Sequence, residues 1–227
     1  MSSETDSQQD LKRAAQAGEA RGILFVVSSP SGGGKGTLIR RVLKSVPNLG
    51  YSISFTTRAP RPEERDGREY RFVSKETFER MIGQDGFLEW AVVHNNLYGT
   101  GREQVLEELS AGRDIMLEID VQGAGNVRRL MPRAVTVFIL PPTFEILRRR
   151  LIGRGSEHPA DLDLRLKNAG AEVLRYSEFD YVLINDELER AAQQLSAIIY
   201  AERARRERQE EQVRRVLASF PPAEPES

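Results

Sequence analysis

The sequence predicts an α/β fold in which a parallel sheet carries helices on both faces. Three observations support this prediction. Short apolar runs alternate with segments whose apolar residues recur at helical spacing. The first apolar run leads into a glycine-rich turn, and a helical pattern follows that turn directly. The chain has 227 residues, which is enough for one core domain with additions, since a domain typically takes about 150.

The expected elements follow one another along the chain. Strands are predicted at residues 23–28, 114–120, 134–140 and 181–185, and helices at 37–46, 121–130 and 143–153, with a final helix after the last strand. The interval from Ser52 to Gly101 is rich in turns and aromatic residues and has a strand pattern at 87–93, so it is predicted to be an inserted subdomain. Trp90 is predicted to lie in the core of that subdomain rather than to stack on a base.

The two ends of the chain differ from its middle. Residues 1–20 lack the apolar stretch of a secretory signal or a membrane span, and we expect a disordered extension there. Residues 201–227 begin with densely charged sequence and end in PPAEPES. The charges suit an exposed helix with i,i+4 pairs, which the prolines then end. A coiled-coil partner is the alternative, but the apolar positions are sparse.

Composition limits the functions that this chain can have. Its formal net charge is -1, which argues against a protein that coats DNA or an anionic membrane. It has no Cys and only two His, which excludes a disulfide framework, a zinc ribbon and a thiol nucleophile. A reducing cytoplasm is therefore the expected compartment. The basic residues are 28 Arg and 5 Lys, an excess that either phosphate recognition or codon bias would explain.

A glycine-rich loop lies between the first strand and the first helix. It meets the P-loop pattern GxxxxGK[ST] at Gly34 and Lys35. It departs from that pattern at Ser29, in place of the first Gly, and at Gly36, in place of Ser or Thr. Successive glycines let backbone N–H groups turn toward a phosphate, and the helix N-terminus adds its dipole. The predicted phosphate-binding residues are Ser29, Pro30, Ser31, Gly32, Gly33, Gly34, Lys35, Gly36 and Thr37.

The departure at Gly36 bears on the metal, because a hydroxyl at that position usually ligates Mg²⁺. Thr37, one residue later, is the candidate ligand; otherwise nucleotide and water alone hold the ion. Glu118 and Asp120 end an apolar strand at the edge where nucleotide sites form. Glu118 would either orient metal-bound water or pair with a neighbouring Arg, and the sequence leaves both readings open.

A longer signature follows the loop. The pattern TTRxxRxxExxGxxYxF is met at every fixed position from Thr56 to Phe72. Further matches are FLEWAVVHNNLYGT at 87–100, LEIDVQG at 117–123 and RLIGRGS at 150–156. On these residues the chain resembles the guanylate kinases, from about residue 22 to about residue 188. The resemblance implies a P-loop NTPase-type parallel sheet flanked by helices, an inserted mixed α/β GMP-binding subdomain and a helical, Arg-rich lid.

The resemblance also implies a division of the chain. The guanylate kinase-like domain would span 21–200, with core segments 21–51, 102–142 and 177–200, the GMP-binding subdomain 52–101 and the lid 143–176. The extension 1–20 and the charged helix and Pro-rich tail 201–227 would lie outside it.

Roles in an acceptor phosphate site are implied as well. Residues that match Arg58, Arg61 and Tyr70 clamp the monophosphate in the family, and Tyr98 would help to close that end of the site. Two guanidinium forks and a phenol hydroxyl suit a dianionic phosphate, because they supply charge and directed donors together.

For the base, Glu89 and Asp120 match the carboxylates that accept from N1 and N2 of guanine. Ser54 and Thr100 match the hydroxyls that donate to O6. Adenine would leave those buried carboxylates unpaired, so the pocket is expected to select GMP over AMP.

The remaining matches fall in the lid and after the last strand. Arg150 and Arg154 match lid residues that reach over the ATP phosphates, and Arg165 matches one that bridges toward the transferred group. Asn185 matches a residue near the adenine of ATP. In-line transfer needs alignment and charge compensation, and no general base, because the acceptor oxygen is already anionic. The catalytic set implied is Lys35, Arg58, Arg150, Arg154 and Arg165.

The function implied is ATP-dependent phosphorylation of GMP and dGMP in purine nucleotide metabolism and GMP recycling, with Mg²⁺ as cofactor. Neither nucleic acid nor a membrane is an expected partner, and a homo-oligomer is left open. One alternative is a guanylate kinase-like binding module that has lost catalysis, but Lys35 and the arginines are all present. The other is a P-loop kinase of another small phosphate, but Glu89 and Asp120 favour guanine.

Overall fold

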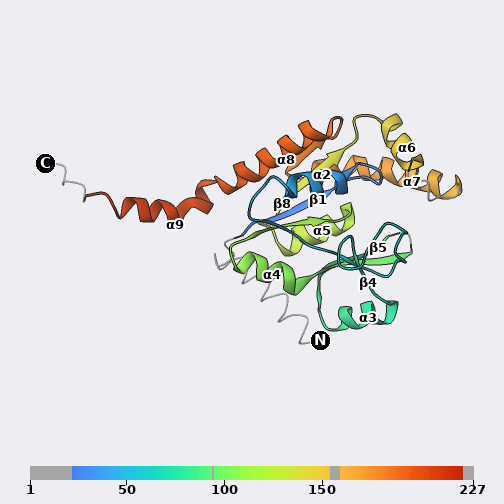
Figure 1. Ribbon diagram of the computed structural model, residues 1–227, viewed down its shortest axis with the longest axis horizontal. Helices are drawn as coiled ribbons and strands as arrows, with labels where there is room; N and C mark the ends of the chain where they lie inside the picture. The colour runs from blue at the N-terminus through green and yellow to red at the C-terminus, as the bar shows by residue number, and fades with distance from the viewer. Residues whose placement is uncertain (1–21, 94, 154–158, 222–227) are drawn as a thin grey trace.

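The computed structural model describes residues 22–93, 95–153 and 159–221, in which two sheets and their helices are arranged as Figure 1 shows. The strands are β1 (Leu24–Ser28), β2 (Leu49–Tyr51), β3 (Phe55–Thr56), β4 (Arg71–Phe72), β5 (Phe87–Val93), β6 (Asn96–Gly101), β7 (Asp114–Glu118), β8 (Val135–Leu140) and β9 (Tyr181–Ile184). The helices are α2 (Lys35–Leu43), α3 (Lys75–Gly83), α4 (Arg102–Ser110), α5 (Val121–Leu130), α6 (Phe144–Ile152), α7 (Pro159–Val173), the 3₁₀ helix η1 (Leu174–Glu178), α8 (Leu188–Arg203) and α9 (Arg206–Leu217).

The larger sheet confirms the predicted α/β fold. Its five strands are parallel and stand in the order β2, β7, β1, β8, β9. The four strands predicted for it from the sequence agree with the structure to within two residues at each end. The strand β2 was not predicted, because its three residues, Leu-Gly-Tyr, carry too short a pattern.

The two faces of this sheet carry separate cores. Along β1, Phe25 and Val27 belong to the cluster covered by α2 and α8. Leu24 and Val26 belong to the cluster covered by α4 and α5. Because successive side chains of a strand point to opposite faces, a strand buried on both sides reads as a continuous apolar run. Both layers hold the ends of β1 and β7 in fixed positions beside each other.

The smaller sheet is inserted between β2 and α4, as the break in the sequence pattern predicts. Its strands stand in the order β4, β3, β6, β5, and it pairs β6 antiparallel with both β3 and β5. Phe78 of α3 and Phe87 stack in its core with ring centroids 4.3 Å apart. The prediction that Trp90 lies in this core was wrong: its side chain is 41% exposed, on the outer face of the edge strand β5.

The C-terminal helix α9 extends away from both sheets (Figure 1, red). None of its residues is buried, and its charges pair along the helix as Arg214–Glu210 and Arg215–Glu211. Residues Arg206–Leu217 thus form an exposed helix with charge pairs at i,i+4 spacing.

Candidate functional site

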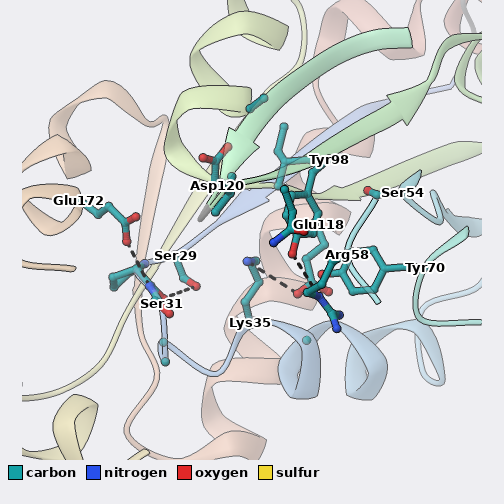
Figure 2. Close-up of a pocket in the computed structure, with 18 of the residues that line it drawn as sticks. Ser29, Ser31, Lys35, Ser54, Arg58, Tyr70, Tyr98, Glu118, Asp120 and Glu172 are labelled. Atoms are coloured by element: carbon teal, nitrogen blue, oxygen red, sulfur yellow. Dashed lines mark hydrogen bonds and ion pairs between the residues drawn. The ribbon is translucent and has the colours of Figure 1, made fainter. Parts of the chain in front are cut away.

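Chemically active residues gather at the carboxyl edge of the larger sheet, where it faces the smaller one. A cavity of about 280 Å³ opens there (Figure 2). One wall is the glycine-rich loop that follows β1, and another is the end of β7. The opposite side is formed by Glu89 of β5 and by Arg58 and Tyr70, from the segment that joins β3 to β4. Parallel strands commonly present ligand sites at this edge, because their loops converge there.

The loop itself is shaped by its glycines. Gly32 and Gly34 have φ of 83° and 87°, a region that side chains with a Cβ rarely adopt. The N–H of Gly33 donates to the carbonyl of Pro30 at 2.9 Å, which closes the turn. The helix α2 begins at Lys35 with no side-chain cap and no acidic residue in its first turn. Its N-terminal N–H groups are therefore suited to an anion.

Two distant residues brace the loop from behind. The side-chain amide of Asn185 donates to the carbonyl of Gly33 at 3.0 Å. The guanidinium of Arg150 donates to the same carbonyl at 3.3 Å and to the carbonyl of Asn185 at 2.9 Å. Gly34 must lack a side chain here, because a Cβ would lie 2.5 Å from the Asn185 amide nitrogen. The structure thus places both residues against the backbone of the loop, a contact that the sequence did not indicate.

Of the two candidate metal ligands, Glu118 lines the cavity and Thr37 is not among the described lining residues. Thr37 is exposed, its hydroxyl accepts from Arg40 at 3.5 Å, and it is not among the described residues that line the cavity. Glu118 does line the cavity, and its Oε1 lies 3.7 Å from Nζ of Lys35. The sequence left open a neighbouring Arg or metal-bound water as the partner of Glu118, and among the described residues the cation that pairs with it is Lys35.

The base-binding candidates form a buried cluster. Glu89 is 7% exposed, and its Oε1 accepts from the hydroxyl of Thr100, the residue opposite it on β6, at 2.7 Å. Burial raises the pKa of Glu89 to about 7; the bond from Thr100 opposes this rise, and the charge of Asp120 adds to it. Ser54 lines the same cavity, whereas Thr100 lies behind Glu89. The cluster therefore offers one buried carboxylate, Glu89, and one half-buried carboxylate, Asp120.

Gly123 is a site residue whose role the sequence did not reveal. Its N–H donates to Oδ1 of Asp120 at 2.8 Å, so the carboxylate caps α5. A Cβ on Gly123 would lie 2.7 Å from Oε2 of Glu89 and 3.1 Å from Oδ1 of Asp120. The two carboxylates can approach each other only because this position has no side chain. The sequence signal was present in LEIDVQG, but a glycine in a motif does not say what it avoids.

The phosphate-clamp candidates are tied together by Glu64. Arg58 donates from Nη2 to both oxygens of Glu64, each at 2.8 Å, and from Nε to the hydroxyl of Tyr98 at 3.2 Å. The backbone N–H of Arg61 donates to Glu64 at 2.9 Å. Burial raises the pKa of Tyr70, so its hydroxyl stays a donor in the cavity. Glu64 is part of the signature with no role assigned to it from the sequence, and the structure shows that it orients the guanidinium of Arg58 and accepts from the backbone of Arg61.

The structure describes only some of the residues predicted for the lid. Arg165 of α7 lines the cavity, while Arg154 lies outside the described residues. From the same helix, Glu172 accepts from the backbone N–H of Ser31 at 3.1 Å, which joins α7 to the loop (Figure 2).

Comparison with known proteins gives one family. The family model described as guanylate kinase matches residues 21–202. A protein of Dechloromonas aromatica named guanylate kinase is 53% identical over 180 residues, which cover 79% of this chain and 89% of that protein. One of Thiobacillus denitrificans with the same name is 49% identical, over 83% of this chain and 90% of its own. The crystal structure of guanylate kinase from Anaplasma phagocytophilum superimposes with a TM-score of 0.71 at 34% identity, over 83% of this chain and 90% of that one.

Proposed function

This chain belongs to the guanylate kinase family and is an enzyme of that class, and we propose that it transfers the γ-phosphoryl group of ATP to GMP and to dGMP. The products are ADP with GDP or dGDP. The observation that carries the proposal is a single cavity with two unlike halves. One half is the glycine-rich loop with Lys35, and the other is the carboxylate pair Glu89 and Asp120.

The carboxylate half suits guanine. An ionised Glu89 accepts from the N–H groups of the base, and Asp120 offers its second oxygen, since Oδ1 is bound to Gly123. Adenine has no N1–H, so it would leave a buried carboxylate unpaired in place of that bond. Ser54 at the cavity wall supplies a hydroxyl for O6.

The clamp holds the acceptor phosphate in line with ATP. Arg58, Arg61 and Tyr70 border the cavity between the base cluster and the loop. Glu64 keeps the guanidinium of Arg58 oriented and bonds the backbone of Arg61, which lowers the entropy lost when the phosphate binds. No side chain has to remove a proton, because the attacking phosphate oxygen is already an anion.

The half of the cavity formed by the glycine-rich loop binds ATP, the phosphoryl donor. Backbone N–H groups at the start of α2 bind the phosphate oxygens of ATP, and Lys35 follows the charge that moves during transfer. Arg165 contributes from the lid side of the cavity, and we propose the same for Arg154. Closure of α7 over the loop excludes water, which would otherwise accept the phosphoryl group.

The residues present fit Mg²⁺. Glu118 supplies a hard carboxylate oxygen beside Lys35, at the edge of the cavity next to the loop. When bound with ATP, Mg²⁺ would offset the negative charge of the phosphates, and Glu118 is the side chain that would hold it beside Lys35. In residues 22–93, 95–153 and 159–221 no three His, Cys, Asp or Glu side chains come together as a metal cage, so nucleotide and water supply the other ligands.

The cellular setting is part of the proposal. We place the enzyme in the cytoplasm, in purine nucleotide metabolism and GMP recycling, with the kinase domain at 21–200 divided into core, GMP-binding subdomain and lid as expected from the sequence. No helix within the described part of the chain combines the length and the apolar character needed to cross a bilayer.

An acceptor screen tests the proposal. ADP release is measured in a coupled assay with GMP, dGMP, AMP, CMP and UMP as acceptors. Turnover with GMP and dGMP, at least about 10²-fold above AMP in kcat/KM, is expected from the unpaired carboxylate that AMP would leave. Preference for another acceptor would point to a different small-phosphate kinase, and release with none would point to a binding module.

A further inference from the structure

Gly36 stands where the P-loop pattern has a hydroxyl, and a neighbouring carboxylate fills the space beside it. A Cβ built on Gly36 would lie 3.3 Å from Oε1 and 3.4 Å from Oε2 of Glu118. Its next neighbour would be Nη1 of Arg40, at 3.6 Å. A side chain at position 36 and the carboxylate of Glu118 therefore compete for one place at the start of α2.

Tyr51 fixes the carboxylate in that place. It ends β2 and stands opposite Met116 on the adjacent strand β7. Met116 and Glu118 project from the same face of β7, because side chains alternate along a strand. The Tyr51 hydroxyl donates to Oε2 of Glu118 at 3.0 Å.

The other carboxylate oxygen lies beside Lys35, on the side of the cavity. Nζ of Lys35 lies 3.7 Å from Oε1, and both residues line the cavity (Figure 2). Tyr51 is not among the described lining residues, so it reaches Glu118 from behind the cavity wall. One oxygen is thus anchored to the fold while the other stays beside the residue that reaches the phosphates.

We propose that Tyr51 is a positioning residue, which holds Glu118 beside Gly36 so that Glu118 takes the metal-facing place of the missing loop hydroxyl. The inference rests on the proposed function, because the metal is the Mg²⁺ that accompanies ATP. Mg²⁺ takes carboxylate oxygen directly or through one of its waters. Without the Tyr51 hydroxyl, Glu118 turns toward Lys35, and metal affinity falls while the base pocket stays intact.

The experiment measures Mn²⁺ binding to the full-length enzyme–ADP complex by electron paramagnetic resonance, with Mn²⁺ in place of Mg²⁺. Tyr51→Phe keeps the ring and removes the hydroxyl. Its Mn²⁺ affinity is expected to fall about tenfold, as when other residues that orient a metal ligand are removed. The matched control is Tyr181→Phe, which loses a 2.5 Å hydrogen bond to Glu202 outside the nucleotide cavity and should bind Mn²⁺ like the parent.

A second background separates positioning from general damage. Gly36→Ser supplies a loop hydroxyl, so Tyr51→Phe should then change Mn²⁺ affinity by less than about threefold, a non-additivity expected of residues that share one task. The KM for GMP should be the same with and without the Tyr51 hydroxyl. If Tyr51→Phe does not fold, Tyr51→Leu, which also lacks the hydroxyl, makes the same comparison in the same two backgrounds.

Parent-like Mn²⁺ affinity in Tyr51→Phe, or an equal loss in both backgrounds, would overturn the inference. A rise in the KM for GMP that matches the metal loss would also overturn it, because Tyr51 would then act on the acceptor pocket. Turnover of GMP by the parent tests the proposed function separately, since the binding of Mn²⁺ and ADP requires no acceptor.

Discussion

The two halves of the cavity bind their ligands by different means. The glycine-rich loop presents backbone N–H groups, and its shape comes from glycines and from Asn185 and Arg150 behind it. The acceptor half presents buried side chains, and its shape comes from hydrogen bonds among them, such as Thr100 to Glu89. A backbone site tolerates changes of side chain that leave the turn intact, whereas a side-chain site depends on each residue type. The departure from the P-loop pattern and the complete acceptor signature agree with this difference.

The largest expected effect is on kcat and comes from removing the Lys35 side chain of the glycine-rich loop. Lys35→Ala should lower kcat about 10³-fold, because a preorganised charge at the transferred group is lost. GMP binding should persist, since Lys35 belongs to neither the base cluster nor the phosphate clamp. Steady-state kinetics and GMP titration measure both quantities. Lys44→Ala, an exposed lysine just past α2, is the control, and turnover in Lys35→Ala equal to that control would refute the loop assignment.

The next largest effect is on the KM for GMP and comes from removing Arg58 from the acceptor half of the cavity. Arg58→Ala removes the guanidinium that bonds Glu64 and Tyr98, so Glu64 also loses its partner in the clamp. The KM for GMP should rise about 30-fold, as expected for a lost hydrogen bond to a charged group, with little change in the KM for ATP. Arg65→Ala, an exposed arginine of the same segment, is the control. A larger rise for ATP than for GMP would contradict the assignment of the clamp.

A smaller effect tests whether the base pocket depends on close packing. Gly123→Ala puts a Cβ 2.7 Å from Oε2 of Glu89, so the carboxylate must shift. The KM for GMP should rise about tenfold, within the range for overpacking, while ATP binding is unchanged. Gly125→Ala on the same helix meets only a guanidinium nitrogen of Arg175, at 3.5 Å, and controls for helix propensity. Equal behaviour of the two variants would show that the pocket can relax.

The smallest effect uses pH. Burial raises the pKa of Glu89 to about 7, and guanine binds its ionised form, so protons compete with the base. Affinity is therefore highest above pH 7 and falls as pH drops through it. Guanosine, which has no phosphate to titrate, should bind about eightfold more weakly at pH 6 than at pH 7.5, as calorimetry can measure. Glu89→Gln should give a flat profile, and a flat profile in the parent would place the Glu89 pKa elsewhere.

Local sequence patterns predicted the strands of the larger sheet and the position of the glycine-rich loop, because both depend on short stretches of sequence. Strands buried on both faces read as apolar runs, and the position of the glycine-rich loop follows from the strand and helix beside it. The prediction that Trp90 is buried was wrong, because the aromatic character of a residue does not tell whether it lies on the inner or the outer face of an edge strand.

Contacts between residues that are distant in the chain could not be predicted from the sequence. Nothing local indicates that Tyr51 would meet Glu118, since the pair forms only when β2 aligns with β7. The same holds for Gly123, whose role depends on Glu89 from the other sheet. Such contacts follow from sheet order, which is set by the packing of the whole chain.

The bond from Asn185 to Gly33 joins residues 152 positions apart in the chain, and this has a consequence for biosynthesis. The loop leaves the ribosome early, but the Asn185 amide that bonds it arrives only with the residues that follow β9. A nascent chain that ends before this point therefore lacks this bond to the loop, and nucleotide cannot stabilise it as it stabilises the finished protein. Nucleotide binding by C-terminally truncated, ribosome-held chains should accordingly begin only when the last strand has joined the sheet.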